Sequence, residues 1–161
     1  MVTRTILNAN RLQLRLATND DAGTLLEWRN NPITREASHN TALVSADEHR
    51  QWLTGILTNA NRRLYVAEIN NAPVGTVRVD SENIGYEFSW TVAPMMRGQG
   101  VGQAMVAQLA KDTLSPIRAE IKIGNIASVR IAEAAGMVFE REHNGVLHYQ
   151  RSKISATSTS V

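Results

Sequence analysis

The sequence predicts a mixed α/β fold, in which a mostly antiparallel sheet carries helices on both faces. Three stretches with strand-like alternation follow one another with only short polar turns between them: "RLYVAEI", "PVGTVRVD" and "IGYEFSWTVAP". Strands joined by tight turns pair antiparallel. The chain order is strand, two helices, three strands, helix, strand, helix and strand pair, and this order is typical of one sheet covered by helices.

The remaining elements follow from periodicity and end signals. Strands are expected over 11–18, 63–69, 73–80, 84–94 and 117–123, and helices over 19–31, 45–59, 100–114 and 126–136. Ser45 and Glu48 form a capping-box pattern, and Gly136 ends the last helix. Asn144-Gly145 splits a closing hairpin. Residues 32–44 show no clean period, so we expect a long connection there.

Composition excludes several classes of protein. The 161 residues suit one domain, which we expect over 1–154, followed by a disordered tail at 155–161. A net charge of +2 without any Lys/Arg-rich run argues against a nucleic-acid binder. There is no cysteine, and the four histidines lack metal-ligand spacing, so we expect no metal site. No apolar run reaches about 18 residues and no signal-peptide core is present, so we expect no membrane span and a cytoplasmic location.

The stretch "RGQGVG", Arg97 to Gly102, stands between a predicted strand and a predicted helix. Backbone N–H groups at a helix start bind anions, and glycine allows close approach, so this loop predicts a phosphate site. A Walker loop would need a Lys after Gly102, where Gln103 stands, and a Rossmann fingerprint would need a glycine there. A glycine turn without any ligand stays open as the alternative.

With "TVAP" before the loop and "GNIASVRIAEAAGM" after it, residues 11–150 resemble the GNAT superfamily of acyl-CoA-dependent N-acetyltransferases. The resemblance implies acetyl-CoA as co-substrate. It places the coenzyme pyrophosphate on Arg97, Gly98, Gly100, Val101 and Gly102. It also implies that backbone around Val92, at a splay or bulge, pairs with the pantetheine arm, and that Asn125 contacts the pantetheine side.

Acetyl transfer to an amine needs a base for the amine proton and benefits from an acid for the departing thiolate. By resemblance, Glu87 is the base, with Glu120 as second choice; either glutamate could instead be a solvated strand residue. Many relatives carry a tyrosine as thiolate acid where this chain has Ala132. Ser128 matches a serine of ribosomal-protein acetyltransferases and could serve there, or it could only cap a helix.

The segments "LLEWRNNPITREAS" and "SADEHRQWL" resemble a narrower group, whose members acetylate nucleotide-linked amino sugars, as in the pseudaminic-acid pathway. This resemblance implies that Arg29, Arg35 and His49 bind the nucleotide phosphates. A protein N-terminus, an aminoglycoside or another small amine stays open as the acceptor. A non-catalytic acyl-CoA-sensing module is a further alternative, and the sequence leaves monomer and homodimer both open.

Overall fold

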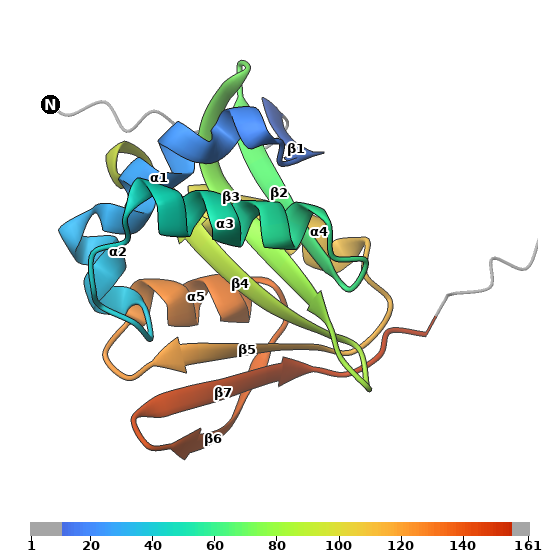
Figure 1. Ribbon diagram of the computed structural model, residues 1–161. Helices are drawn as coiled ribbons and strands as arrows, with labels where there is room; N and C mark the ends of the chain where they lie inside the picture. Colours follow the sequence, from blue (N-terminus) through green and yellow to red (C-terminus); the bar gives the residue numbers. More distant parts are fainter. Residues whose placement is uncertain (1–10, 156–161) are drawn as a thin grey trace, which may run out of the picture.

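The computed structural model describes residues 11–155, which form a seven-stranded sheet with the order β1-β2-β3-β4-β5-β7-β6 (Figure 1). The strands are β1 (Leu12–Leu16), β2 (Arg62–Ile69), β3 (Ala72–Ser81), β4 (Tyr86–Val92), β5 (Ile117–Lys122), β6 (Val138–His143) and β7 (Val146–Arg151). Every neighbouring pair is antiparallel except β4 and β5, which are parallel. The predicted mixed, mostly antiparallel sheet is confirmed.

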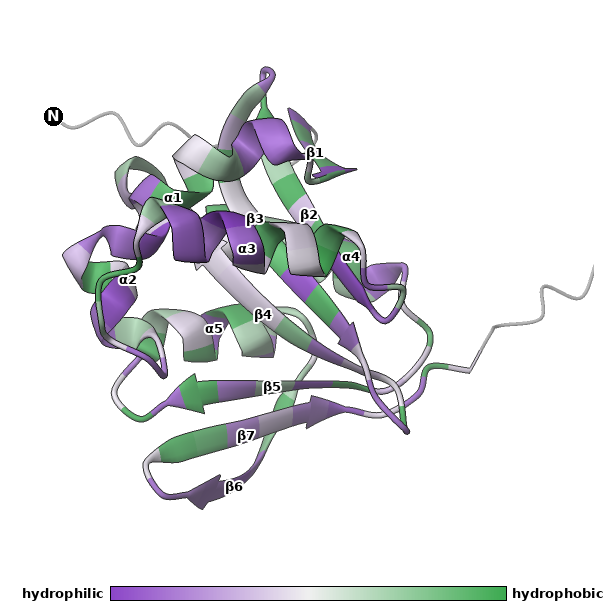
Figure 2. Cartoon of the chain, in the orientation of Figure 1, coloured by the Kyte–Doolittle hydropathy of each residue, from purple (hydrophilic) through white to green (hydrophobic). Residues whose placement is uncertain are grey.

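Helices cover both faces of this sheet, as predicted. The helices α1 (Ala22–Asn30), α2 (Pro32–Ala37) and α3 (Ala46–Leu57) lie on one side, and α4 (Val101–Lys111) and α5 (Ile126–Ala134) on the other. Leu25, Trp28 and Leu53 form the core under α1 and α3, while Phe88, Met105 and Ile131 belong to the core under α4 and α5. In Figure 2 hydrophilic residues occupy the first half of α3, and more hydrophobic ones follow in its second half. The helices α1, α3, α4 and α5 each bury apolar side chains in these cores, whereas the buried residue of α2 is Thr34.

The predicted long connection over 32–44 is wrong in its first part, because α2 begins there. Asn31 is extended, and its side chain accepts a hydrogen bond from the N–H of Ile33. Pro32 is the first helical residue, a position where its missing N–H costs nothing. An Asn cap followed by Pro is a helix start signal, but six residues are too few to show a period. The connection proper runs from 38 to 45.

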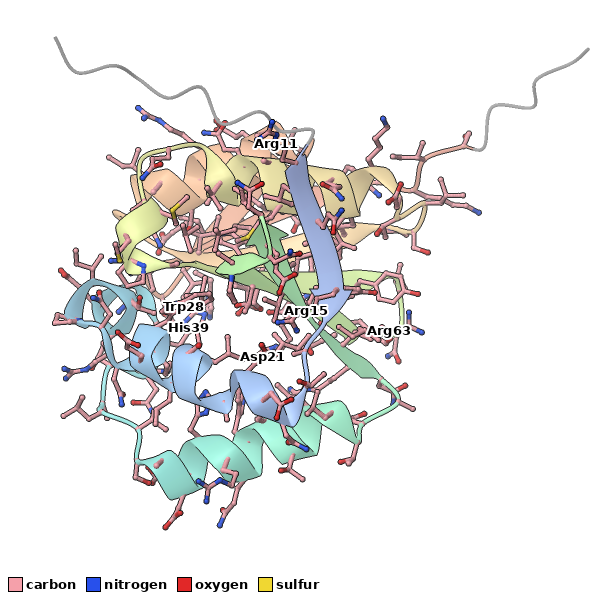
Figure 3. All side chains as sticks on the ribbon, turned by 90° about the horizontal axis from the view of Figure 1, so that it is seen from above. Arg11, Arg15, Asp21, Trp28, His39 and Arg63 are labelled. Carbon is pink, nitrogen blue, oxygen red and sulfur yellow. The ribbon has the colours of Figure 1, made fainter. Side chains whose placement is uncertain are left out.

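An ion network fixes the point where the chain leaves β1 for α1. Arg15 on β1 donates to both carboxylate oxygens of Asp21, at 2.8 and 2.9 Å, and to Glu68 on β2 at 2.7 Å. Figure 3 shows Arg15 and Asp21 pointing toward one another. The Arg15 guanidinium holds the pKa of Asp21 below its usual range. Asp21 also completes a capping box with Thr18 on the 3₁₀ turn Asn19–Asp21, which leads directly into α1, and its bonds to Arg15 hold this turn to the sheet.

Two further expectations concern a membrane-spanning helix and a metal site. Within residues 11–155 no helix is long and apolar enough to cross a membrane. The same stretch contains no group of three His, Cys, Asp or Glu side chains that could hold a metal ion. Residues 156–161 lie outside the described range, so the expected disordered tail stays a prediction.

Close packing between β3 and α4 predicts a strong effect at Gly75. A Cβ on this residue would lie 2.7 Å from the sulfur of Met105 and 2.8 Å from the carbonyl oxygen of Thr91. We expect Gly75→Ala to lower the free energy of unfolding by about 1–3 kcal/mol, because the strand or the helix must shift. Gly55→Ala is the matched control: nothing lies within 4 Å of its Cβ position in the exposed face of α3. It should raise stability by up to about 1 kcal/mol. Denaturant unfolding measures both, and equal effects would contradict the packing argument.

Candidate active site

A cleft of about 1720 Å³ opens between the α1–α3 side and the sheet with α4 and α5. It runs from the glycine loop before α4, along β4, to the connection that follows α2. Every site residue predicted from the sequence lines it except Arg35: these are Arg29, His49, Glu87, Val92, Arg97, Gly98, Gly100, Val101, Gly102, Glu120, Asn125 and Ser128. Residues spread over a hundred positions of the chain are thus brought to one cavity.

The glycine loop has the geometry of an anion site. Gly98 and Gly100 have φ values of 74° and 80°, and no atom lies within 4 Å of either Cβ position. Gly100 directly precedes Val101, where α4 begins, so the first N–H groups of the helix lack intrahelical partners there. Gly102 differs, because its Cβ would lie 2.4 Å from Cδ1 of Ile131. It lets α4 approach α5, while the other two leave room for a ligand.

Arg97 reaches from this loop to α2. Its Nη1 donates to Oδ1 of Asn31 at 3.1 Å, and its Nη2 donates to the hydroxyl of Thr34. Both partners are neutral oxygens, and within residues 11–155 no carboxylate pairs with this guanidinium. Burial lowers the pKa of Arg97 from its ordinary value. A partly buried cation without an anionic partner, beside open N–H groups, fits a pyrophosphate.

The strands β4 and β5 separate soon after they meet. They pair only at Tyr86↔Ile117 and Glu87↔Arg118. On its other edge β4 stays paired with β3 as far as Val92↔Gly75, without a register shift. Among residues 11–155, one edge of β4 beyond Glu87 therefore has no strand partner, and it borders the cleft. The strands thus separate directly after Glu87, and the unpaired backbone of β4 could hydrogen-bond an extended amide chain. The contact of a pantetheine arm near Val92 stays a prediction.

The start of α5 gives Asn125 and Ser128 different roles. Oδ1 of Asn125 accepts from the N–H of Ser128 at 3.1 Å, so Asn125 is the N-cap. The Ser128 hydroxyl instead accepts from Nε1 of Trp90 at 3.1 Å across the gap between the strands. Its own hydrogen can still be donated into the cleft. Ala132 is fully buried, so its position contributes no group to the cleft.

Glu87 lies at the point where β4 and β5 separate. Its carboxylate accepts from Nη2 of Arg118 at 3.0 Å, and its side chain is 21% exposed. Burial raises the pKa of Glu87, and the carboxylates of Glu120, Glu82 and Asp80 act in the same direction, whereas Arg118 opposes them. A carboxylate with a raised pKa beside a cleft has the property that a general base needs.

The wall opposite Glu87 is built from α1, α3 and the connection after α2. Nη2 of Arg29 donates to the carbonyl of Asn40 at 2.6 Å, while its Nη1 is buried and has no hydrogen-bond partner among residues 11–155. The His49 ring is 4% exposed and lies 5.2 Å from the Trp52 ring. Burial lowers the pKa of His49, with Arg29 adding to the effect, which favours the neutral ring.

Arg35 does not share this cleft. It lies on α2 and its Nε donates to the carbonyl of Thr41 at 2.9 Å. The sequence spacing could not show this, because the predicted connection over 32–44 hid a helix that turns Arg35 toward its own following segment. It holds that segment through this bond, and its predicted contact with a nucleotide phosphate stays a prediction.

Sequence reasoning missed two basic residues of β5. Arg118 binds Glu87, and Nζ of Lys122 donates to the carbonyls of Glu36 and Ser38, at 2.8 and 3.1 Å. The alternation of "IRAEIK" does put Arg118, Glu120 and Lys122 on one face of the strand. Their partners lie on β4 and α2, far away in the sequence. The alternation therefore predicted that these side chains share one face of β5, but it did not predict which residues they contact.

An open helix start, an unpaired strand edge and a half-buried glutamate lie in one cleft, an arrangement that suits an enzyme that transfers a group from a phosphate-bearing carrier. The sequence matches the family model described as acetyltransferase (GNAT) domain over residues 11–138, so the chain belongs to the GNAT acetyltransferase family. It is an acetyl-CoA-dependent N-acetyltransferase, with acetyl-CoA as co-substrate. No curated protein is similar enough in sequence to count as a match.

Solved structures share the fold. A spermidine N-acetyltransferase from Vibrio cholerae, in complex with CoA and spermine, is 19% identical; the alignment covers 89% of this chain and 96% of that one, with a TM-score of 0.77. An aminoglycoside acetyltransferase in complex with coenzyme A and kanamycin is 20% identical, with coverages of 88% and 94% and a TM-score of 0.73. A GNAT acetyltransferase from Streptococcus pneumoniae is 15% identical, with coverages of 87% and 98% and a TM-score of 0.67. At these identities the likeness shows the fold alone.

Proposed function

We propose that this enzyme moves an acetyl group directly from acetyl-CoA to the primary amine of a small molecule, with Glu87 as general base. The position of Glu87 carries the proposal. It is a largely enclosed carboxylate in the cleft, at the start of the unpaired β4 edge, and its pKa is raised by burial. An ammonium group must lose a proton before its nitrogen can attack, and such a carboxylate can accept that proton.

The coenzyme is proposed to lie along the glycine loop and the β4 edge. The N–H groups from Gly98 to Gly102 and the Arg97 guanidinium would hold the pyrophosphate. Backbone near Val92 and the side of Asn125 would contact the pantetheine arm. Acetyl-CoA supplies the acetyl group as an activated thioester.

Ser128 is proposed to donate its hydroxyl proton to the departing thiolate. The hydroxyl already accepts from Trp90, which fixes its oxygen and leaves its hydrogen available. Glu120 is the alternative base. It also lines the cleft and binds Arg118, but its side chain is more exposed than that of Glu87, at 31%. Its greater exposure ranks it second.

For the acceptor we propose a nucleotide-linked amino sugar. Nη1 of Arg29 is a buried donor without a partner among residues 11–155, and a phosphate oxygen could satisfy it. The His49 and Trp52 rings line the same wall, where a flat base could contact them. The neutral state favoured for His49 makes Arg29 the principal cation of this subsite.

A cationic acceptor, such as a polyamine or an aminoglycoside, is the second candidate. Glu82, Glu87 and Glu120 gather around Arg118, so three carboxylates meet one guanidinium. The excess negative charge favours an acceptor with several ammonium groups. The spermidine and aminoglycoside enzymes that share the fold are bound to acceptors of this kind in their structures.

Replacing Arg97 tests the coenzyme site. We expect Arg97→Ala to weaken coenzyme A binding by about tenfold or more, the size of a lost charged hydrogen bond. Thr34→Val is the control, because it removes the α2 partner of Arg97 and leaves the guanidinium in place. Calorimetry with coenzyme A measures both. If Thr34→Val weakens binding as much as Arg97→Ala does, Arg97 serves to hold α2 and not the pyrophosphate.

Replacing Glu87 tests the base. We expect Glu87→Gln to lower kcat by about 10²-fold or more with unchanged coenzyme affinity. In the parent enzyme kcat/KM should fall with decreasing pH as Glu87 takes up its proton, at a higher pH than an ordinary glutamate would show, because the pKa of Glu87 is raised. Glu120→Gln is the paired variant. Normal turnover by Glu87→Gln and loss in Glu120→Gln would exchange the two roles.

A panel of acceptors tests the substrate class: a nucleotide-linked amino sugar, spermidine, kanamycin and a peptide with an unblocked N-terminus. We expect acetylation of the sugar, inhibited by a nucleoside diphosphate in competition with the acceptor, and relieved in Arg29→Ala. Arg35→Ala is the matched control, since Arg35 holds the same segment from outside the cleft. Turnover of spermidine or kanamycin without nucleotide inhibition would establish the cationic acceptor instead.

A further inference from the structure

We propose that Arg118 is the positioning residue of the active site, which orients the Glu87 carboxylate and keeps it ionised among neighbouring acidic groups. The proposal rests on the proposed role of Glu87 as base. Arg118 does not line the cleft itself, so it acts through Glu87 and not on a substrate.

The contact is built into the sheet. Glu87 and Arg118 lie opposite one another in the short parallel ladder of β4 and β5, at its last pair before the strands separate. Nη2 of Arg118 donates to Oε2 of Glu87 at 3.0 Å. The backbone of two paired strands thus sets the distance between the two side chains.

Other carboxylates fix the guanidinium in turn. Nη1 donates to Glu120 on β5 at 3.0 Å, and Nε and Nη2 donate to the two oxygens of Glu82, at 2.5 and 2.6 Å. The Arg118 guanidinium therefore binds carboxylates from the β3–β4 turn, from β4 and from β5. A group held in this way cannot rotate away from Glu87 without breaking other charged hydrogen bonds.

The charges around Glu87 explain why a cation is needed. From β3 comes Asp80, which Arg78 and Arg62 pair; from the following turn comes Glu82. Glu120 comes from β5. These three carboxylates disfavour a further negative charge on Glu87.

Other basic side chains contact the neighbouring carboxylates and not Glu87 itself. His148 of β7 lies 3.9 Å from Glu120, and only Arg118 binds Glu87 directly among the residues described. Removing this guanidinium leaves Glu82, Glu87 and Glu120 without a shared cation. The base would then hold its proton to higher pH.

The test compares kcat/KM against pH in three variants, with coenzyme affinity and thermal unfolding as checks of folding. We expect Arg118→Gln to move the acidic limb of the profile to higher pH, with about a tenfold loss near pH 6 that largely closes at high pH. Arg118→Lys keeps a positive charge but loses the planar guanidinium with its several donors. The acidic limb of its pH profile should therefore stay near that of the parent enzyme, while kcat falls. Glu82→Gln removes a neighbouring negative charge and should move the limb to lower pH.

Opposite shifts in Arg118→Gln and Glu82→Gln support the proposal, since a purely structural role of Arg118 would lower activity equally at all pH values. An unmoved limb in both variants, with Glu87→Gln inactive, overturns the proposal and leaves the base assignment intact. An active Glu87→Gln overturns the base assignment itself. If Arg118→Gln does not fold, Glu82→Gln and Arg118→Lys decide by the same signs.

Discussion

The early separation of β4 and β5 is the constraint on which the rest of the site depends. Two parallel register pairs hold the strands together, and beyond Glu87 no strand of the described part of the chain pairs with this edge of β4. Backbone donors and acceptors in a protein must be satisfied, so a strand edge opened inside a fold is a place for a ligand or water. Trp90 reaches across the gap to Ser128, which ties the start of α5 to β4 without closing the gap. The separation of β4 from β5 thus opens the cleft and determines which residues line it.

The opposite wall is held to the sheet by hydrogen bonds that do not involve paired charges. Arg97 binds side-chain oxygens at the start of α2, and Lys122 binds two carbonyls at its end. Asn30 holds the segment that follows through both the N–H and the carbonyl of Val44. A six-residue helix is marginal by itself, so these contacts give α2 its place. Because Arg97 belongs to the glycine loop, its hydrogen bonds to Asn31 and Thr34 link this loop directly to α2 on the opposite wall of the cleft.

The sequence predicted most of the fold and the membership of the site, but not its internal contacts. Strand alternation, the capping box at Ser45 and the Asn144-Gly145 turn are local signals, and local signals define elements. The short helix α2 was not predicted because six residues show no period, and the contact of Arg35 with Thr41 was missed with it. The pairing of Glu87 with Arg118 depends on the register between strands separated by a helix, which no local pattern encodes. The sequence motifs identified residues that line the cleft, but they did not identify the side chains, such as Arg118, that hold those residues in place.

The electrostatic design of the cleft follows from its two ends. At the glycine loop, helix N–H groups and Arg97 present positive charge without anionic partners, which suits a pyrophosphate. Beside Glu87 the balance reverses, because three carboxylates surround Arg118. An amine arrives as a cation and is attracted to this end, yet it must lose a proton there to react. Burial and the neighbouring carboxylates raise the pKa of Glu87, whereas Arg118 opposes them. With Glu87 as the proposed base, the same charge cluster would serve both attraction of the amine and its deprotonation, and Arg118 would set the balance between them.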